Sequence, residues 1–196
     1  MPSAASSGWT YEGSDATQLL GCTAWAREMM IAAGVLEGAM SGVPYVGLLE
    51  GRDAAQVIAE TPVRLGLILD GLSTAEIETR PAKGKWCVRE IIAHLADCEI
   101  AWAWRLRQVL GEDHVAIQPF EQDAWAKVYD AYSFEMAWAT FKALRTWNLA
   151  FVGALSKEDR KKGYTHPERG DDETLWTLVE IMAGHDLHHL AGLRKR

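Results

Sequence analysis

Three of the six histidines of this chain fall within five positions near its C-terminus, at His185, His188 and His189. A neutral imidazole is a common ligand of divalent transition metals in proteins. Two histidines four positions apart on a helix share one face, which brings their ring nitrogens close enough to bind a single ion. The spacing of His185 and His189 therefore indicates a metal-binding pair, although such pairs also occur as hydrogen-bonded core residues.

The helix that must position this pair is indicated by the apolar residues around it, which recur at helical spacing from after Thr174 to about Leu193. Continued along the helix, the apolar stripe lands on His185 and His189, which take the places of core residues. His188 lies more than about 100° from the centre of the stripe, on the flank of the helix. We therefore expect only two of the three clustered histidines to point into the protein.

A third candidate ligand, His94, lies on a different predicted helix, which runs from Val88 to about Leu110. Helical bundles build metal sites from side chains that project inward from facing helices. Three protein ligands leave coordination positions open, as in catalytic zinc sites, whereas structural zinc is usually held by four. His94, His185 and His189 are thus the predicted ligands of a catalytic metal; the alternative for His94 is a partly exposed surface histidine.

Several other polar side chains could serve this centre. Asp97 and Asp186 are candidate acceptors for the second ring N–H of a ligand histidine, a contact that fixes the orientation of the ring. Glu99 falls on an apolar stripe, where an unpaired carboxylate is costly, so we expect it either to be paired or to act in catalysis. Its candidate partners, which could instead contact substrate, are Arg105, Arg145 and Asn148. Spacing does not choose among these three.

His166 precedes the last predicted helix, in the segment from Thr165 to Gly170. It could reach the centre as a proton donor or a substrate contact, or it could lie in a surface turn. Glu99 and His166 are the candidate catalytic residues.

The elements that position these residues are predicted to be four helices, since no segment of useful length alternates as a strand would. Connections of roughly 15 to 20 residues separate them, too long for the tight turns of a simple up-down bundle, so crossovers are expected. We predict an all-α four-helix bundle at residues 46–196 and an N-terminal extension at residues 1–45, with one short helix within Thr23 to Met40. The expected bundle helices are Asp53 to Asp70, Val88 to Leu110, Phe134 to Leu155, and the segment from Thr174 to Leu193.

Composition narrows the function further. The 196 residues include 20 Lys and Arg against 27 Asp and Glu, for a net charge of -7 without a basic block, which argues against nucleic acid as a partner. Three widely spaced cysteines do not fit a disulfide framework. The first residues lack the features of a secretory signal, and no apolar run approaches the ~18 residues that span a membrane. We expect a cytoplasmic protein without a membrane partner.

Three motifs resemble those of the DinB-like family: KWCVREIIAHLADCE at residues 85–99, HPERG at 166–170 and AGHDLHHL at 183–190. The resemblance extends from about Tyr45 to the end of the chain. One departure is Cys87, which stands at the start of a helix where the family commonly has Ser or Thr. The resemblance implies a four-helix bundle with long crossovers and a divalent metal ion held at His94, His185 and His189, the histidines that helical spacing also selects.

The wider superfamily that includes mycothiol-dependent maleylpyruvate isomerase contains thiol-dependent S-transferases, in which the metal activates a thiol. The resemblance therefore implies zinc or nickel, a low-molecular-weight thiol cosubstrate, a small-molecule substrate and an S-transferase-like activity. One alternative is a metal-dependent hydrolase that uses metal-bound water. Another is a non-catalytic binding or dimerisation module whose interface includes some of the nine tryptophans. We expect a homodimer.

Overall fold

The computed structural model describes residues 42–195, apart from the side chains of Asp171 and Asp172. These residues belong to a unit that spans Ser41–Arg196. The short helix expected within Thr23 to Met40 lies outside the described residues.

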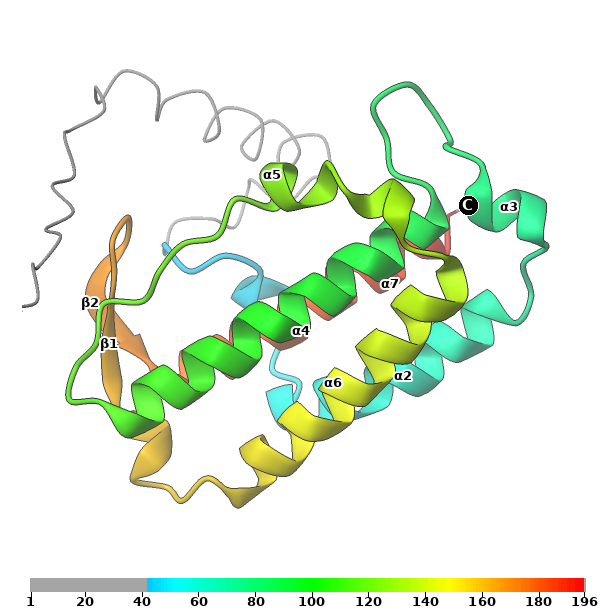
Figure 1. Ribbon diagram of the computed structural model, residues 1–196. Coiled ribbons are helices and arrows are strands. Elements are labelled where there is room, and N and C mark those ends of the chain that lie inside the picture. The colour runs from blue at the N-terminus through cyan, green and yellow to red at the C-terminus, as the bar shows by residue number, and fades with distance from the viewer. Residues whose placement is uncertain (1–41, 196) are drawn as a thin grey trace, which may run out of the picture. The chain divides into compact units, whose positions relative to one another are not determined.

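Four long helices form a bundle and confirm the predicted all-α class (Figure 1). They are α2 (Ala54–Leu69), α4 (Val88–Gly111), α6 (Phe134–Ala154) and α7 (Leu175–Leu193), each within one residue of its predicted bounds. Helix α4 packs against α6 and α7, and α2 packs against the same two helices from the other side. The shorter helical elements are η2 (Val46–Leu49), α3 (Thr74–Glu78), α5 (Gln122–Ala126), η3 (Tyr129–Ala131) and η4 (Asp159–Lys161).

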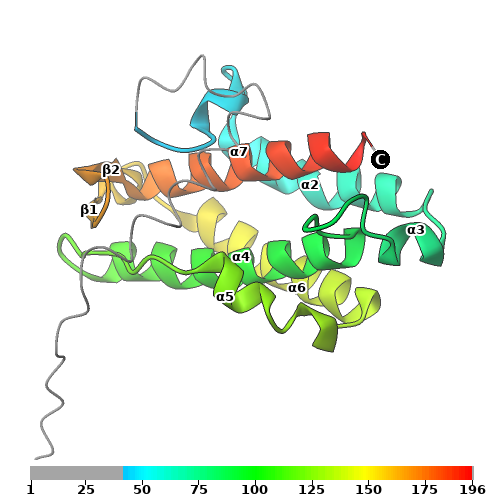
Figure 2. The ribbon, with the colours of Figure 1, turned by 90° about the horizontal axis from the view of Figure 1, so that it is seen from above.

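The chain reaches this arrangement through a crossover, as expected. Helices α4 and α6 run in one direction, and α2 and α7 run in the opposite one (Figures 1 and 2). Residues 112–133 therefore return along the whole of α4. Their first part is held near β1, where Ile117 N donates to Thr165 O at 3.1 Å. Their last part is held at the start of α4, where Arg89 Nη1 donates to Tyr129 O at 2.6 Å.

A two-stranded antiparallel sheet precedes α7 and corrects the expectation of a strand-free domain. It consists of β1 (Gly163–His166) and β2 (Gly170–Thr174), with Tyr164 opposite Glu173. Strands of four and five residues are too short for an alternating pattern to stand out from neighbouring loop residues. The turn between them uses Gly170 at a φ of 99°, a conformation that glycine adopts without strain.

Helix starts follow local capping chemistry. The Asp53, Ser133 and Thr174 side chains accept hydrogen bonds from backbone N–H groups in the first turns of α2, α6 and α7. At α4 the cap is different, since Cys87 N donates to Glu90 Oε2 at 2.8 Å.

Helix α2 continues through Pro62, although a proline inside a helix commonly kinks or ends it. Proline has no N–H, so the carbonyl four residues earlier, at Ile58, loses its helical donor. Arg145 Nη1 from α6 donates to that oxygen at 2.9 Å. The contact from α6 thus replaces the missing helical hydrogen bond, and the helix does not need to restart.

Two apolar clusters fill the bundle and meet at the level of the histidines. The boundary between them falls between Ala96 and Cys98 on α4 and between Leu187 and Leu190 on α7. A Cβ at Gly184 of α7 would lie 2.2 Å from the Tyr45 carbonyl oxygen. The absence of a side chain at Gly184 therefore permits the backbone at Tyr45 to pack closely against α7. Within residues 42–195, no helix is both long and apolar enough to span a membrane.

Candidate metal centre

Helices α4 and α7 bring the three predicted ligand histidines together between the two apolar clusters. His185 Nε2 lies 3.1 Å from His94 Nε2 and 3.1 Å from His189 Nε2. The rings of His94 and His189 have centroids 5.1 Å apart. His94 and His185 are buried, and His189 is half-buried. Three ring nitrogens from two helices therefore converge on one region.

The donor set fits a divalent metal better than it fits hydrogen bonding. One neutral imidazole nitrogen carries either a hydrogen or a lone pair, so His185 Nε2 cannot make good hydrogen bonds to both neighbours. Two nitrogens bound to one zinc ion at about 2.0–2.1 Å lie roughly 2.8 Å apart at a right angle and roughly 3.4 Å apart at the tetrahedral angle. The two distances of 3.1 Å fall within that range.

Electrostatics also keep the rings in the form that binds metal. Burial, with a smaller contribution from His188, lowers the pKa of His94 to about 4. Burial first, and then the nearby His94 and His188 rings, lower the pKa of His185 well below its ordinary value. Both rings are therefore neutral at pH 7, which is the state that ligation requires.

Cys98, which is not among the predicted site residues, lies beside this centre on α4. Its Sγ lies 3.5 Å from His94 Nε2. One potential ligand atom from each of His94, Cys98 and His185 lies within 4.8 Å of the other two. The spacing in the sequence is consistent with this contact, because Cys98 follows His94 by four positions and so lies on the same helix face. An apolar stripe contains many such positions, so spacing alone does not single it out.

The second buried feature is a charge network beside the histidines that joins three helices. Arg145 of α6 donates through Nη2 to Glu99 Oε1 at 2.7 Å and through Nη1 to Asp186 Oδ2 at 2.6 Å. Asn148 Nδ2 donates to Glu99 Oε2 at 2.9 Å. All four side chains are buried. Burial would lower the pKa of Arg145, but the charges of Asp186 and Glu99 raise it above its ordinary value.

This network assigns the partners that spacing left open. Glu99 is paired with Arg145 and Asn148, and it is not among the residues described as lining the cavity beside the histidines. Both Asp186 carboxylate oxygens accept from Arg145, which makes Asp186 a member of this network. Asp97 is half-buried, and burial raises the pKa of its carboxyl. No hydrogen bond within residues 42–195 links Asp97 to His94 or His185.

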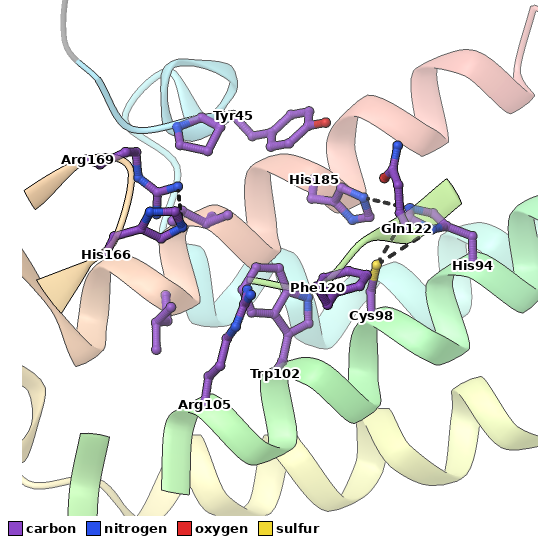
Figure 3. A pocket seen from close by; sticks show the side chains of 13 residues that line it. Tyr45, His94, Cys98, Trp102, Arg105, Phe120, Gln122, His166, Arg169 and His185 are labelled. Carbon is purple, nitrogen blue, oxygen red and sulfur yellow. Dashed lines mark hydrogen bonds between the residues drawn. The ribbon is translucent and has the colours of Figure 1, made fainter. Parts of the chain in front are cut away.

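His166 lies at a cavity of about 140 Å³ whose lining also includes His94 and His185. Figure 3 shows His94, His185 and Cys98 on one side of this cavity and His166 with Arg169 on the other. His166 Nε2 faces Arg169 Nη1 at 2.9 Å, and burial, followed by the charge of Arg169, lowers the pKa of His166. The structure thus brings His166 to the same cavity as the histidine cluster, away from the surface turn that was its alternative.

Comparison with known proteins supplies a second line of information. The model of the DinB superfamily matches residues 58–192. The Bacillus subtilis protein YfiT, described as a probable metal-dependent hydrolase with an unusual four-helix bundle topology, is 26% identical with a TM-score of 0.66 over 72% of this chain and 82% of that chain. The Oceanobacillus iheyensis protein OB0782, whose name describes a metal-dependent hydrolase, is 30% identical over 68% of this chain and 78% of its own length.

A protein from Bacillus cereus with the same kind of name is 27% identical over 72% of this chain and 83% of its own. These names support dependence on a divalent metal and the hydrolase alternative. They do not mention transfer of a thiol, so the S-transferase activity stays a prediction.

Proposed function

The chain belongs to the DinB superfamily, and from that premise we propose that it is a metal-dependent hydrolase of a small molecule. His94, His185 and His189 would hold the ion, and the cavity beside them would hold the substrate. The convergence of the three Nε2 atoms at 3.1 Å on His185 carries this proposal. The names of the relatives support it. A set of nitrogen donors suits zinc or nickel.

The chain divides the work of such a reaction among several groups. When bound, the divalent ion supplies a Lewis acid and a source of nucleophilic water at neutral pH. The three imidazoles would hold it and leave coordination positions open, and burial keeps His94 and His185 in the neutral form that ligation needs by lowering the pKa of both rings. Trp102 and Phe120 line the cavity with apolar surface that limits water around the substrate. His166 Nδ1 accepts from Glu168 N at 3.2 Å and Nε2 faces Arg169 Nη1 at 2.9 Å, so the ring is held at the far side of the cavity, where it can contact the substrate.

Arg145 acts on this centre through packing. It joins Glu99 on α4 to Asp186, the residue next to His185 on α7. The two helices that carry the ligands are thereby fixed relative to each other, and Glu99 and Asp186 are positioning residues.

Metal analysis of the full chain, purified without added metal, tests the proposal. We expect about one zinc or nickel ion per chain and hydrolysis of at least one member of a panel of small activated esters and amides. A chelator should abolish the hydrolysis, and the metal should restore it. Purified protein with no stoichiometric metal, or hydrolysis that survives chelation, would contradict the proposal. If a low-molecular-weight thiol gives a thioether product instead, mass spectrometry of the products assigns the protein to the transferases.

Replacement of Cys98 by alanine should leave the coordination of the metal unchanged. A hydrolase needs an open position, whereas a fourth protein ligand would close the site. In protein loaded with Co²⁺, we expect no thiolate-to-cobalt charge-transfer absorption in the near ultraviolet, and the same spectrum in Cys98→Ala. A strong band in the wild type that disappears in Cys98→Ala would show a closed site of four ligands and would contradict an open catalytic centre. Cys87→Ala, which alters a buried thiol at the start of α4, is the matched control.

A further inference from the structure

Arg105 is a buried cation without an ionic partner among the described residues. Arg105 is only 8% exposed, yet none of the ion pairs within residues 42–195 includes it. The other buried arginine, Arg145, faces two carboxylates. Burial lowers the pKa of Arg105, but a guanidinium stays charged in proteins. Because an unpaired buried charge is costly, this arrangement calls for a counter-ion.

The protein stabilises Arg105 with neutral groups only. Nε and Nη2 donate to Gln118 O at 3.2 and 2.7 Å. The guanidinium carbon also lies 5.6 Å from the centroid of the Trp102 ring and 5.4 Å from that of Phe120. No hydrogen bond of Nη1 is recorded to a described residue. The Nη1 side of the guanidinium is thus available to a ligand. The Gln118 carbonyl and the two aromatic rings fix the direction in which the guanidinium points.

The charge of Arg105 faces the cavity of the proposed active site. Arg105 lines that cavity together with His94, His166 and His185, and no Asp or Glu is among the described lining residues. Figure 3 shows Arg105 rising from α4 beside Trp102, on the side of His166 and away from Cys98. The neighbouring cation, Arg169, is already neutralised by hydrogen bonds to Glu173, one of them at 2.9 Å. One uncompensated positive charge therefore remains at this end of the cavity.

We propose that the substrate carries a carboxylate, which binds Arg105, at the opposite end of the molecule from the bond that is cleaved beside the histidines. This inference rests on the proposed hydrolase function for the cleaved bond, whereas the carboxylate site stands on Arg105 itself. A singly charged carboxylate matches the one positive charge of Arg105 and can accept from the open Nη1 side of its guanidinium, whereas a phosphate dianion would leave negative charge uncompensated. The Trp102 and Phe120 rings between the two ends fit a flat, apolar middle part of the substrate.

The dimensions agree with a small acid. Arg105 follows His94 by eleven positions on α4, which corresponds to a rise of about 16 Å between their Cα atoms. The two side chains span part of this distance. The cavity has a volume of about 140 Å³, which corresponds to about five water molecules at ~30 Å³ each. A short molecule with a free carboxylate at one end and an amide or ester bond at the other is the substrate class that these features describe.

Calorimetric titration of the full chain with phenylacetate and with the neutral isostere phenylacetamide tests the inference. We expect phenylacetate to bind at least tenfold more tightly than phenylacetamide, because a charge-assisted pair with a desolvated arginine is stronger than a neutral hydrogen bond. Arg105→Gln should remove this preference and leave the weak binding of phenylacetamide, which reports an intact cavity. Arg105→Lys, which keeps the charge but not the fork, should retain part of the preference.

Two controls separate carboxylate binding at Arg105 from binding at another arginine or at the metal. Arg107→Gln removes an arginine of the same helix that lies over Phe151 and does not line the cavity, and the preference should persist. Metal-free protein should also keep the preference, because the carboxylate binds Arg105 and not the ion. Equal binding of the two probes, or an unchanged preference in Arg105→Gln, would overturn the inference even if the metal is present. Absence of metal with the preference intact would overturn only the hydrolase proposal.

Discussion

Replacement of His185 by alanine is expected to remove the bound metal and to lower hydrolysis by more than about a hundredfold. His185 Nε2 is the nitrogen that lies 3.1 Å from both of the other ligand candidates. Loss of a group that only orients a ligand typically costs about 10- to 100-fold in metal affinity or activity, so loss of a central ligand should cost more. Elemental analysis and a metal-competition titration measure the change in affinity.

Thermal unfolding provides a readout that does not depend on activity. Saturating metal binds the folded state and should raise the melting temperature of the wild type, but not that of His185→Ala. The matched control is His188→Ala, three positions further along α7, whose ring contacts Tyr45 and His189 at the flank of the helix. His188→Ala should keep stoichiometric metal. If His185→Ala keeps it too, or if both variants lose it equally, the assignment of the ligands is wrong.

Replacement of Arg145 by methionine is expected to lower the free energy of unfolding by about 3–5 kcal/mol. The substitution leaves Glu99 and Asp186 buried without a cation and leaves the Ile58 carbonyl, freed by Pro62, without a donor. Breaking a buried ion pair on one side is costly because an uncompensated charge stays behind. Urea denaturation of the metal-free protein measures the loss and keeps it separate from metal binding.

The same experiment separates the charges from the packing of the side chain. Adding Glu99→Gln and Asp186→Asn to Arg145→Met removes the uncompensated charges and should recover at least half of the lost stability. Lys142→Met, which removes an exposed cation over Trp138 on the same helix, should cost less than about 1 kcal/mol. A loss in Arg145→Met no larger than that in Lys142→Met would contradict the role of the network.

Local sequence determines much of this protein because helical periodicity is a local property. The spacing of apolar residues predicts all four long helices, and Ser133 and Thr174 mark the starts of two of them. The same periodicity selects His94, His185 and His189 and leaves His188 on the flank. The direction of each side chain about its own helix axis depends only on its position along that helix.

The partners of the charged side chains depend on tertiary structure. Glu99 and Asp186 lie 46 and 41 residues from Arg145 in the chain. Spacing within a helix carries no information about which side chain of another helix will face them. Arg105 and Arg145 look equivalent in the sequence, yet one closes a buried network and the other faces the cavity without an ionic partner among the described residues. The crossover and the packing of α4, α6 and α7 decide this difference.

The sequence by itself determined the helices, the face on which each histidine lies and the family resemblance. Tertiary structure alone decided that the histidine nitrogens meet, that Cys98 lies beside them, and that the hairpin brings His166 to the same cavity. The physical reason is that a helix fixes the angle of a side chain through local backbone geometry. The distance between side chains on different helices is fixed only when the helices pack and the long connections close.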